Sequence, residues 1–213
     1  MIDVVLQINA AARRVGSRTL EAGEARVVSI GRTYDSSVDD VWDACTNPDR
    51  IPRWFLPVTG DLRVGGRFQL EGNAGGTIER CDPPQGFAAT WEFGGAVSWI
   101  ELRLSPEPDG RTRLELDHTV PVDAHWEEFG PGAVGVGWDL AMADLGLHLA
   151  SGEPLDRDAV AAWSSSGEGL GFMRESSERW GEAHRASGAD RAEAEAMTAR
   201  TTAAYTGGES ESA

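Results

Sequence analysis

One histidine in this sequence is expected on the apolar face of a strand, where an imidazole could move a proton. In residues 111–120, alternate positions share a face, and the apolar face carries Thr112, Leu114, Leu116, His118 and Val120. The opposite face carries Arg111, Arg113, Glu115, Asp117 and Thr119. A buried imidazole has a pKa that is sensitive to its surroundings and could act as a general acid or base. A lone histidine on an apolar face is more often held by a neighbouring hydroxyl or carbonyl, so His118 is a weak catalytic candidate.

Large aromatic side chains are the second feature with chemical meaning, because the chain contains 8 tryptophans. Flat rings give a large contact area at a small entropic cost and suit the wall of an apolar ligand pocket. The alternative is ordinary core filling. The residues expected to bind a ligand are Trp54, Phe68, Trp91, Phe93, Trp99, His118, Trp138 and Met142.

Two charged residues could add specificity to such a pocket. By alternation, Glu79 shares a face with Thr77 and Cys81, and the pattern does not tell which face is inward. Glu79 could pair with an arginine or place a ligand proton, or it could lie on a solvated face. Arg67 could anchor a ligand carboxylate, or it could be a surface strand residue.

Several site types are not expected. The pairs Gly65-Gly66 and Gly75-Gly76 do not fit a phosphate-binding loop and are interpreted as hairpin turns. The glycines of residues 128–137 are expected to let a long helix begin close to a sheet. No HExxH, GxSxG or spaced His/Asp cluster occurs, so neither a metal site nor a cofactor is expected. The absence of lysine excludes a Schiff-base lysine.

Charge and cysteine content narrow the class of partner. The net charge of −16 disfavours nucleic acid and anionic membrane surfaces as partners. Cys45 and Cys81 lack metal-ligand spacing and are expected to be free thiols. Without a basic N-terminal region, an apolar signal segment or a run of about 20 apolar residues, the protein is expected to be cytoplasmic.

Hydrophobic periodicity predicts the elements that position these residues. We expect a short apolar element over 2–8, helical through 13, and a hairpin around 22–24. A capped helix over 38–45 is followed by a short helix opened by Pro48. Six strands are predicted at 61–64, 67–72, 77–81, 87–93, 98–104 and 111–120.

A long helix over 130–152 follows the strands, and its stripe Trp138, Met142, Leu145 and Leu149 is expected to face the sheet. Two more helices are predicted at 169–187 and 190–206, joined to it through a loop at 164–167. The predicted division of the chain is an N-terminal arm (1–24), a main domain (25–152), a C-terminal helical extension (153–206) and a disordered tail (207–213).

In this order the elements resemble the START-like (polyketide cyclase and dehydrase) superfamily, in the branch named for the activator of the heat-shock-protein-90 ATPase. The resemblance rests on RTYDSSVDDVWDACTNPDRIPRWF, GDLRVGGRFQL, GGTIERCDPPQGFAATWEF, GRTRLELDHTV and GVGWDLAMADLGLHL, within residues 26–150. It implies an α+β helix-grip fold, with a curved antiparallel sheet around a long helix and a hydrophobic cavity. Members bind lipids, polyketides, hormones or aromatic compounds, and a few catalyse cyclisation or dehydration.

Three functions therefore stay open. The first is binding of a small apolar molecule, and the second is a cyclase- or dehydratase-type enzyme that uses His118. The third is a chaperone regulator or interaction module. In that case the amphipathic residues Phe172, Met173 and Trp180 of the C-terminal helices would bind a protein partner. The alternative for these three residues is packing back on their own domain or across a homodimer.

Overall fold

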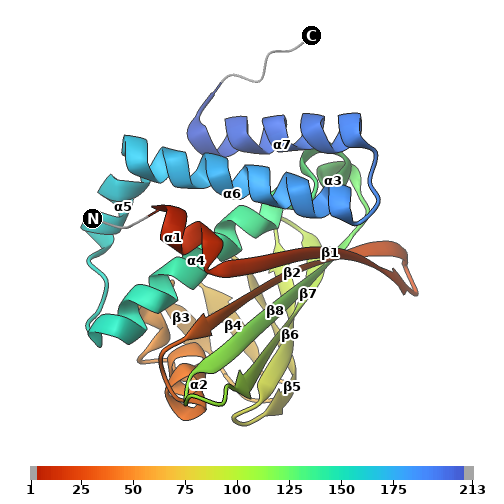
Figure 1. Ribbon diagram of the computed structural model, residues 1–213. Helices are drawn as coiled ribbons and strands as arrows, with labels where there is room; N and C mark the ends of the chain where they lie inside the picture. The colour runs from red at the N-terminus through yellow and green to blue at the C-terminus, as the bar shows by residue number, and fades with distance from the viewer. Residues whose placement is uncertain (1–3, 209–213) are drawn as a thin grey trace. The chain divides into compact units, whose positions relative to one another are not determined.

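The computed structural model describes residues 4–208, which form one eight-stranded sheet and seven α-helices (Figure 1). The predicted disordered tail, except for Gly207 and Gly208, and the first residues of the predicted apolar element lie outside the described residues. The strands are β1 Ala11–Leu20, β2 Gly23–Tyr34, β3 Val58–Gly60, β4 Arg67–Leu70, β5 Gly75–Asp82, β6 Gly86–Phe93, β7 Ala96–Pro106 and β8 Thr112–Pro121. The α-helices are α1 Val4–Asn9, α2 Val38–Thr46, α3 Ala124–Phe129, α4 Gly132–Ser151, α5 Arg157–Ser164, α6 Gly167–Ala186 and α7 Arg191–Thr206, and the 3-10 helix η1 spans Ile51–Arg53.

The sheet has the strand order β1-β2-β8-β7-β6-β5-β4-β3. Neighbouring strands from β3 to β8 pair antiparallel, as expected for a meander. The first of the six predicted strands was misplaced, because β3 lies at Val58–Gly60 and residues 61–64 belong to the loop between β3 and β4. The Asp61 amide donates to the Arg67 carbonyl (2.8 Å), and Gly65 has a positive φ of 80°. This hairpin closes before residues 62–64 can extend.

Capping residues predicted the boundaries of helices more accurately than the strand pattern predicted the position of β3. Ser37 caps α2, its Oγ accepting from the Asp40 amide, and Gly152 follows α4 with φ of 71°. Helix α1 ends at Asn9, so the prediction of a helix through Arg13 was wrong, and Arg13 lies in β1. Helices α6 and α7 match the two predicted C-terminal helices. The short helices α3 and α5, capped by Asp123 and Asp156, were not predicted.

Two compact units can be described separately. The terminal unit contains the described residues within Met1–Ile30, Val120–Leu140 and Asp156–Ala213. The meander unit contains Gly31–Thr119 and Ala141–Leu155. Described residues from both the first and the last part of the chain therefore belong to one unit. The predicted division at residues 24, 152 and 206 stays a prediction.

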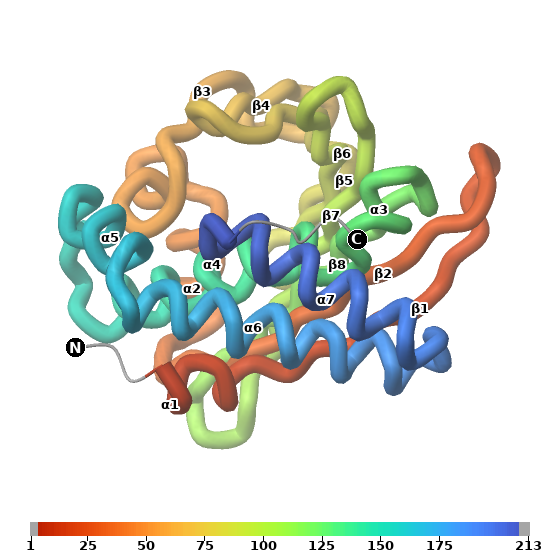
Figure 2. Tube along the Cα trace, turned by 90° about the horizontal axis from the view of Figure 1, so that it is seen from above, coloured from red at the N-terminus to blue at the C-terminus, as the bar shows by residue number. Residues whose placement is uncertain are grey.

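In the terminal unit, α6 and α7 lie side by side, and α1 and β1 lie beside α6 (Figures 1 and 2). Helix α6 buries Phe172, Met173 and Trp180, which are 1%, 7% and 0% exposed. The alternative interpretation of these residues is therefore confirmed, since they pack back on their own unit. A partner could contact the C-terminal helices only through other side chains.

A buried ion pair joins α4 to β1 in the terminal unit. The side chains of Arg13 and Asp139 are 6% and 2% exposed, and Arg13 Nη2 lies 2.6 Å from Asp139 Oδ1. Arg13 Nε donates to Asp139 Oδ2 (2.9 Å), which also accepts from Ser176 Oγ (2.6 Å) and Trp180 Nε1 (2.9 Å). Because both Asp139 oxygens accept hydrogen bonds, the charge is compensated in the core.

Close packing of α4 on α6 predicts a sharp difference between two glycines of α4. A Cβ at Gly135 would lie 2.3 Å from Trp180 Cε2, whereas the nearest atom at Gly137 is Tyr205 Oη at 3.7 Å. Gly135→Ala should lower the free energy of unfolding by about 1–3 kcal/mol through overpacking. Gly137→Ala, the matched control, should raise it by roughly 0.5–1 kcal/mol through helix propensity. Urea unfolding of both variants checks this, and equal effects would contradict the packing.

No helix among residues 4–208 is both long enough and apolar enough to cross a membrane.

Candidate functional site

In the meander unit, β6, β7 and β8 present one uncharged face. The register pairs Trp91 with Ser98, Ala89 with Ile100, and Ile100 with His118. The apolar face therefore consists of Phe87, Ala89, Trp91, Ser98, Ile100, Leu102, Leu104, Thr112, Leu114, Leu116 and His118. Trp42 of α2 packs edge-on against Phe87, with ring centroids 6.5 Å apart. The opposite face carries ion pairs such as Arg103–Asp117 (2.7 Å).

Three of the predicted ligand-binding residues come together on this face. The Phe68 and Trp91 ring centroids lie 6.4 Å apart, and the Trp91 and His118 centroids lie 6.1 Å apart with an edge-on geometry. Gly76 allows β5 to approach Phe68, because a Cβ there would lie 3.0 Å from the Phe68 ring and 2.0 Å from the Thr90 carbonyl oxygen. We call Phe68, Trp91 and His118 the aromatic cluster.

The hydrogen bonds of Ser98 define the protonation of His118. Ser98 Oγ donates to the Trp91 carbonyl (3.0 Å) and lies 2.8 Å from His118 Nε2. Since the hydroxyl has one hydrogen, His118 Nε2 must carry a hydrogen and donate it to Ser98. Burial lowers the pKa of His118 to about 4, so the ring is neutral at neutral pH. His118 is therefore held by a neighbouring hydroxyl, that of Ser98, as is common for a histidine on an apolar face.

Met142 is buried in the second half of α4 and contacts β2. The Tyr34 hydroxyl donates to the Met142 carbonyl (2.9 Å) and lies 3.2 Å from Met142 Sδ. This contact places Met142 on the side of α4 that faces β2, where the side chain is 4% exposed.

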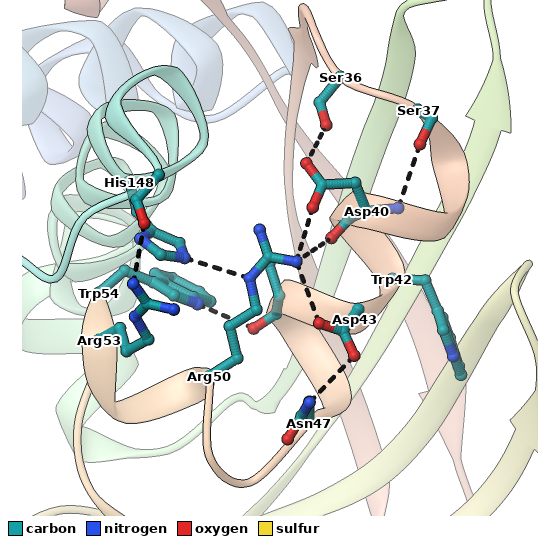
Figure 3. Close-up of polar contacts among 12 residues, drawn as sticks. Ser36, Ser37, Asp40, Trp42, Asp43, Asn47, Arg50, Arg53, Trp54 and His148 are labelled. Atoms are coloured by element: carbon teal, nitrogen blue, oxygen red, sulfur yellow. Dashed lines mark hydrogen bonds and ion pairs between the residues drawn. The ribbon is translucent and has the colours of Figure 1, made fainter.

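Trp54 lies in a different cluster, which joins α2, η1 and the end of α4 (Figure 3). Its Nε1 donates to the Ala44 carbonyl (2.9 Å), and its ring stacks on Phe55 at 5.3 Å. Arg50 pairs with Asp40 (2.6 Å) and Asp43 (3.0 Å). These contacts fix the segment after α2 to α2 itself.

The same arginine holds the last turn of α4. Arg50 Nε donates to His148 Nε2 (3.2 Å), so His148 Nδ1 must carry the hydrogen that it donates to the Glu153 carbonyl (2.8 Å). Arg53 Nη2 donates to the Gly152 carbonyl (2.8 Å). Burial alone would raise the pKa of Asp40, but hydrogen bonds from Ser36 and Arg50 outweigh it and lower that pKa.

The other predicted ligand-binding residues do not join the aromatic cluster. Trp99 pairs with Thr90 and Thr119 and points to the face opposite Ser98 and Ile100. Phe93 lies at the end of β6 and is 60% exposed. Trp138 belongs to the terminal unit.

The two charged candidates both lie in solvent. The register of β5 shifts between Ile78 and Arg80, so Glu79 sits at a bulge, and the expected alternation with Thr77 and Cys81 fails there. Glu79 is exposed, which agrees with its solvated interpretation. Arg67 is exposed and pairs with Glu92 at 2.7 Å, as a surface strand arginine would.

Sequence reasoning missed a titratable residue of the meander unit. Asp144 lies in the second half of α4, in the apolar run Leu140–Leu149, where an acid is unusual. Burial raises the pKa of Asp144 to about 7. An acid flanked by apolar residues in a helix that was expected to cover the sheet was the signal that could have identified it.

Residues 4–208 contain no group of three or more His, Cys, Asp or Glu side chains that could hold a metal ion. Both cysteines are free thiols, and burial raises the pKa of Cys45 to about 12. A protonated thiol of this kind is a packing residue and a poor nucleophile.

Comparison with known proteins decides the family. Residues 35–150, more than half of the chain, match the family described as Activator of Hsp90 ATPase homolog 1-like protein. The chain belongs to this family. The resemblance inferred from the sequence is confirmed, together with the α+β helix-grip fold class.

Solved structures of relatives extend this family match. The solution structure of CalU16 from Micromonospora echinospora is 41% identical, covers 84% of this chain and 97% of its own, and has a TM-score of 0.72. The crystal structure of CalU16 is 40% identical, covers 83% of this chain and 99% of its own, and has a TM-score of 0.68. PFC0360w, described as an HSP90 activator from Plasmodium falciparum, is 21% identical, covers 60% of this chain and 97% of its own, and has a TM-score of 0.51, which shows the fold alone. None of the curated proteins compared with this chain matches it.

Proposed function

We propose that this family member binds a small apolar ligand, such as a lipid, polyketide or aromatic compound, against the apolar face of β6–β8. The observation that carries the proposal is the aromatic cluster, in which Phe68, Trp91 and His118 meet on a face without charged side chains. Aromatic walls with few polar groups are typical of small-molecule sites. Cytoplasmic location stays a prediction.

The first test is native mass spectrometry of the protein purified from its own host, followed by denaturing extraction. A stoichiometric apolar molecule would support the proposal and provide the natural ligand. Calorimetric titration of 2-(1-naphthyl)ethanol into the protein tests binding of a defined apolar probe. This test applies whether or not the extraction releases a natural ligand. Saturable binding is expected, because the probe combines a flat ring with one hydroxyl.

The aromatic cluster predicts which variants weaken this binding. Phe68→Ala should weaken binding of 2-(1-naphthyl)ethanol about tenfold or more, because a lost aromatic contact costs about 1.5 kcal/mol. Trp99→Ala is the matched control, since Trp99 lies on the opposite face of the same sheet. Calorimetric titration of the two variants measures the difference. Equal weakening, or weakening by Trp99→Ala alone, would place the ligand elsewhere.

A second candidate is an enzyme of cyclase or dehydratase type on a similar ligand. It is favoured by the His118–Ser98 contact (2.8 Å), since a neutral, oriented imidazole can accept a proton. Once a ligand is identified, turnover at the parent's rate by His118→Ala would exclude this role.

A third candidate follows from the family description and from the HSP90 activator among the fold relatives. Such a regulator would bind a protein partner, or a second copy, through exposed side chains of the C-terminal helices. Stimulation of a purified Hsp90 ATPase by the protein measures this role directly.

A further inference from the structure

Ser98 is a polar residue that contacts two members of the aromatic cluster. The register of β6 and β7 places Ser98 opposite Trp91, and Ser98 lies diagonally from His118, whose partner in β7 is Ile100. The three side chains share the uncharged face of β6–β8. A ligand that lies against the aromatic cluster would therefore meet Ser98 as well.

Three residues of this face have a hydroxyl or imidazole side chain, and they differ in exposure. Thr112 is 0% exposed, and its Oγ1 donates to the Ser36 carbonyl (2.7 Å). His118 is 2% exposed, whereas Ser98 is half-buried. Of these three polar groups, the Ser98 hydroxyl is the one that a ligand can reach.

Both polar hydrogens of the Ser98–His118 pair are already used. A carbonyl oxygen carries no hydrogen, so the 3.0 Å contact with the Trp91 carbonyl requires the Ser98 hydroxyl as donor. His118 Nε2 then donates to Ser98 Oγ (2.8 Å). Burial lowers the pKa of His118 to about 4, so at neutral pH the ring gains no second N–H. The pair has no hydrogen left to donate to a ligand.

Ser98 Oγ can still accept one more hydrogen bond. A hydroxyl oxygen has two lone pairs, and the N–H of His118 occupies one of them. The bond that Ser98 donates to the Trp91 carbonyl also polarises the hydroxyl and strengthens it as an acceptor. The polar group that this position offers to a ligand is therefore an acceptor.

We propose that Ser98 Oγ accepts a hydrogen bond from a hydroxyl group of the apolar ligand. The proposal rests on the proposed ligand-binding function and names the polar group of that ligand, which is an alcohol or a phenol. A buried ligand hydroxyl needs such a partner, because its loss of water is otherwise uncompensated. A halide or ether obtains no hydrogen bond from the pair, and a carboxylate meets no cation on this face.

The experiment compares 2-(1-naphthyl)ethanol with 1-(2-fluoroethyl)naphthalene, which has the same ring system and a fluorine of similar size in place of the hydroxyl. Each probe is titrated by calorimetry into the full chain at neutral pH. Fluorine cannot donate a hydrogen bond, so only the alcohol can use Ser98 Oγ. The quantity compared between the parent and a variant is the ratio of the two dissociation constants, because the contribution of the ring cancels in it.

Variants of Ser98 show whether its hydroxyl determines this ratio. Ser98→Ala should reduce the preference for the alcohol about two- to tenfold, as expected when one hydrogen bond between neutral groups is lost. Ser98→Thr retains the hydroxyl and should keep most of the preference. Ser105→Ala is the matched control, since it removes an exposed hydroxyl from the opposite face of the same strand and should leave the ratio unchanged.

A measurement on the parent protein needs no variant. In the NMR spectrum of the complex with 2-(1-naphthyl)ethanol, nuclear Overhauser effects should connect the CH2–OH protons of the probe to the Ser98 β-protons. The naphthyl protons should show such effects to the rings of Phe68 and Trp91.

The outcomes separate this proposal from the one on which it rests. If both probes bind and Ser98→Ala leaves the ratio unchanged, or Ser105→Ala lowers it equally, the role of Ser98 is refuted while apolar binding stands. Contacts of the CH2–OH group away from Ser98 refute it as well, even if Ser98→Ala does not fold. If neither probe binds, the proposed function itself is contradicted.

Discussion

Replacing Asp139 with asparagine should lower the free energy of unfolding by about 3–5 kcal/mol, as when one partner of a buried ion pair is removed. The Arg13 guanidinium would stay buried, with a side chain 6% exposed, and would lose the charge that compensates it. An amide also offers one acceptor oxygen where the carboxylate offers two. Three of the four hydrogen bonds to the Asp139 carboxylate, those from Arg13 Nε, Ser176 Oγ and Trp180 Nε1, converge on Oδ2. Urea unfolding measures the loss.

Two controls show whether the buried charge causes that loss. Glu195→Gln breaks the exposed Arg191–Glu195 pair (2.7 Å) and should cost less than about 1 kcal/mol. The double variant Arg13→Met, Asp139→Leu removes both charges and should be more stable than Asp139→Asn, because no uncompensated ion remains. A loss under 1 kcal/mol for Asp139→Asn would show that the network does not hold β1, α4 and α6 together.

Structural features that depend on neighbouring residues, such as the buried face of a strand and the ends of a helix, were predictable from the sequence. Residues 112, 114, 116 and 118 alternate with charged residues, and all four are buried in β8. Ser37 and Gly152 marked the start of α2 and the end of α4, because capping depends on a few neighbouring residues. The alternation within β8 also predicted the correct face for His118. It did not predict that Ser98 is the partner of His118.

The face of Trp99 could have been predicted but was not. Within β7, Ser98, Ile100, Leu102 and Leu104 alternate with Trp99, Glu101 and Arg103. Trp99 shares its face with the charged residues, so its aromatic character was given more weight than its register. At Glu79 the alternation itself fails, because a bulge interrupts the strand. No residue type in TIERC predicts this bulge.

Contacts between distant parts of the chain were beyond sequence reasoning. Arg13 and Asp139 are separated by 126 positions, and Arg50 and His148 by 98. A single sequence shows that these residues are charged or titratable, but not which of many possible partners each one meets. For this reason α6 and α7 could be predicted as helices, while the packing of α6 on β1 could not.

Asp144→Asn should have the opposite effect to Asp139→Asn, and its size should depend on pH. The pKa of Asp144 is raised to about 7 in the folded protein, against about 3.9 for an unfolded aspartate. Between these values the folded state retains a proton that the unfolded state has lost, so the stability of the parent falls as pH rises from about 4 to about 7. At about 1.4 kcal/mol per pKa unit, the full loss is about 4 kcal/mol.

Asparagine does not titrate, so the variant escapes this loss. Asp144→Asn should match the parent near pH 4 and exceed its free energy of unfolding by several kcal/mol above about pH 7. Urea unfolding of both proteins from about pH 5 to about pH 9 tests this. His118, whose pKa is lowered to about 4, reduces stability as pH falls from about 6.5, but it does so equally in both proteins and cancels in their difference.

The sign of that difference bears on function. A residue that contributes only to folding should not be improved by a nearly isosteric substitution, whereas a binding residue can be kept at a cost in stability. Asp144→Asn, if more stable at alkaline pH, would show that Asp144 is kept at a cost in folding stability. A pH-independent difference between the two proteins would mean that Asp144 is ionised in the folded state.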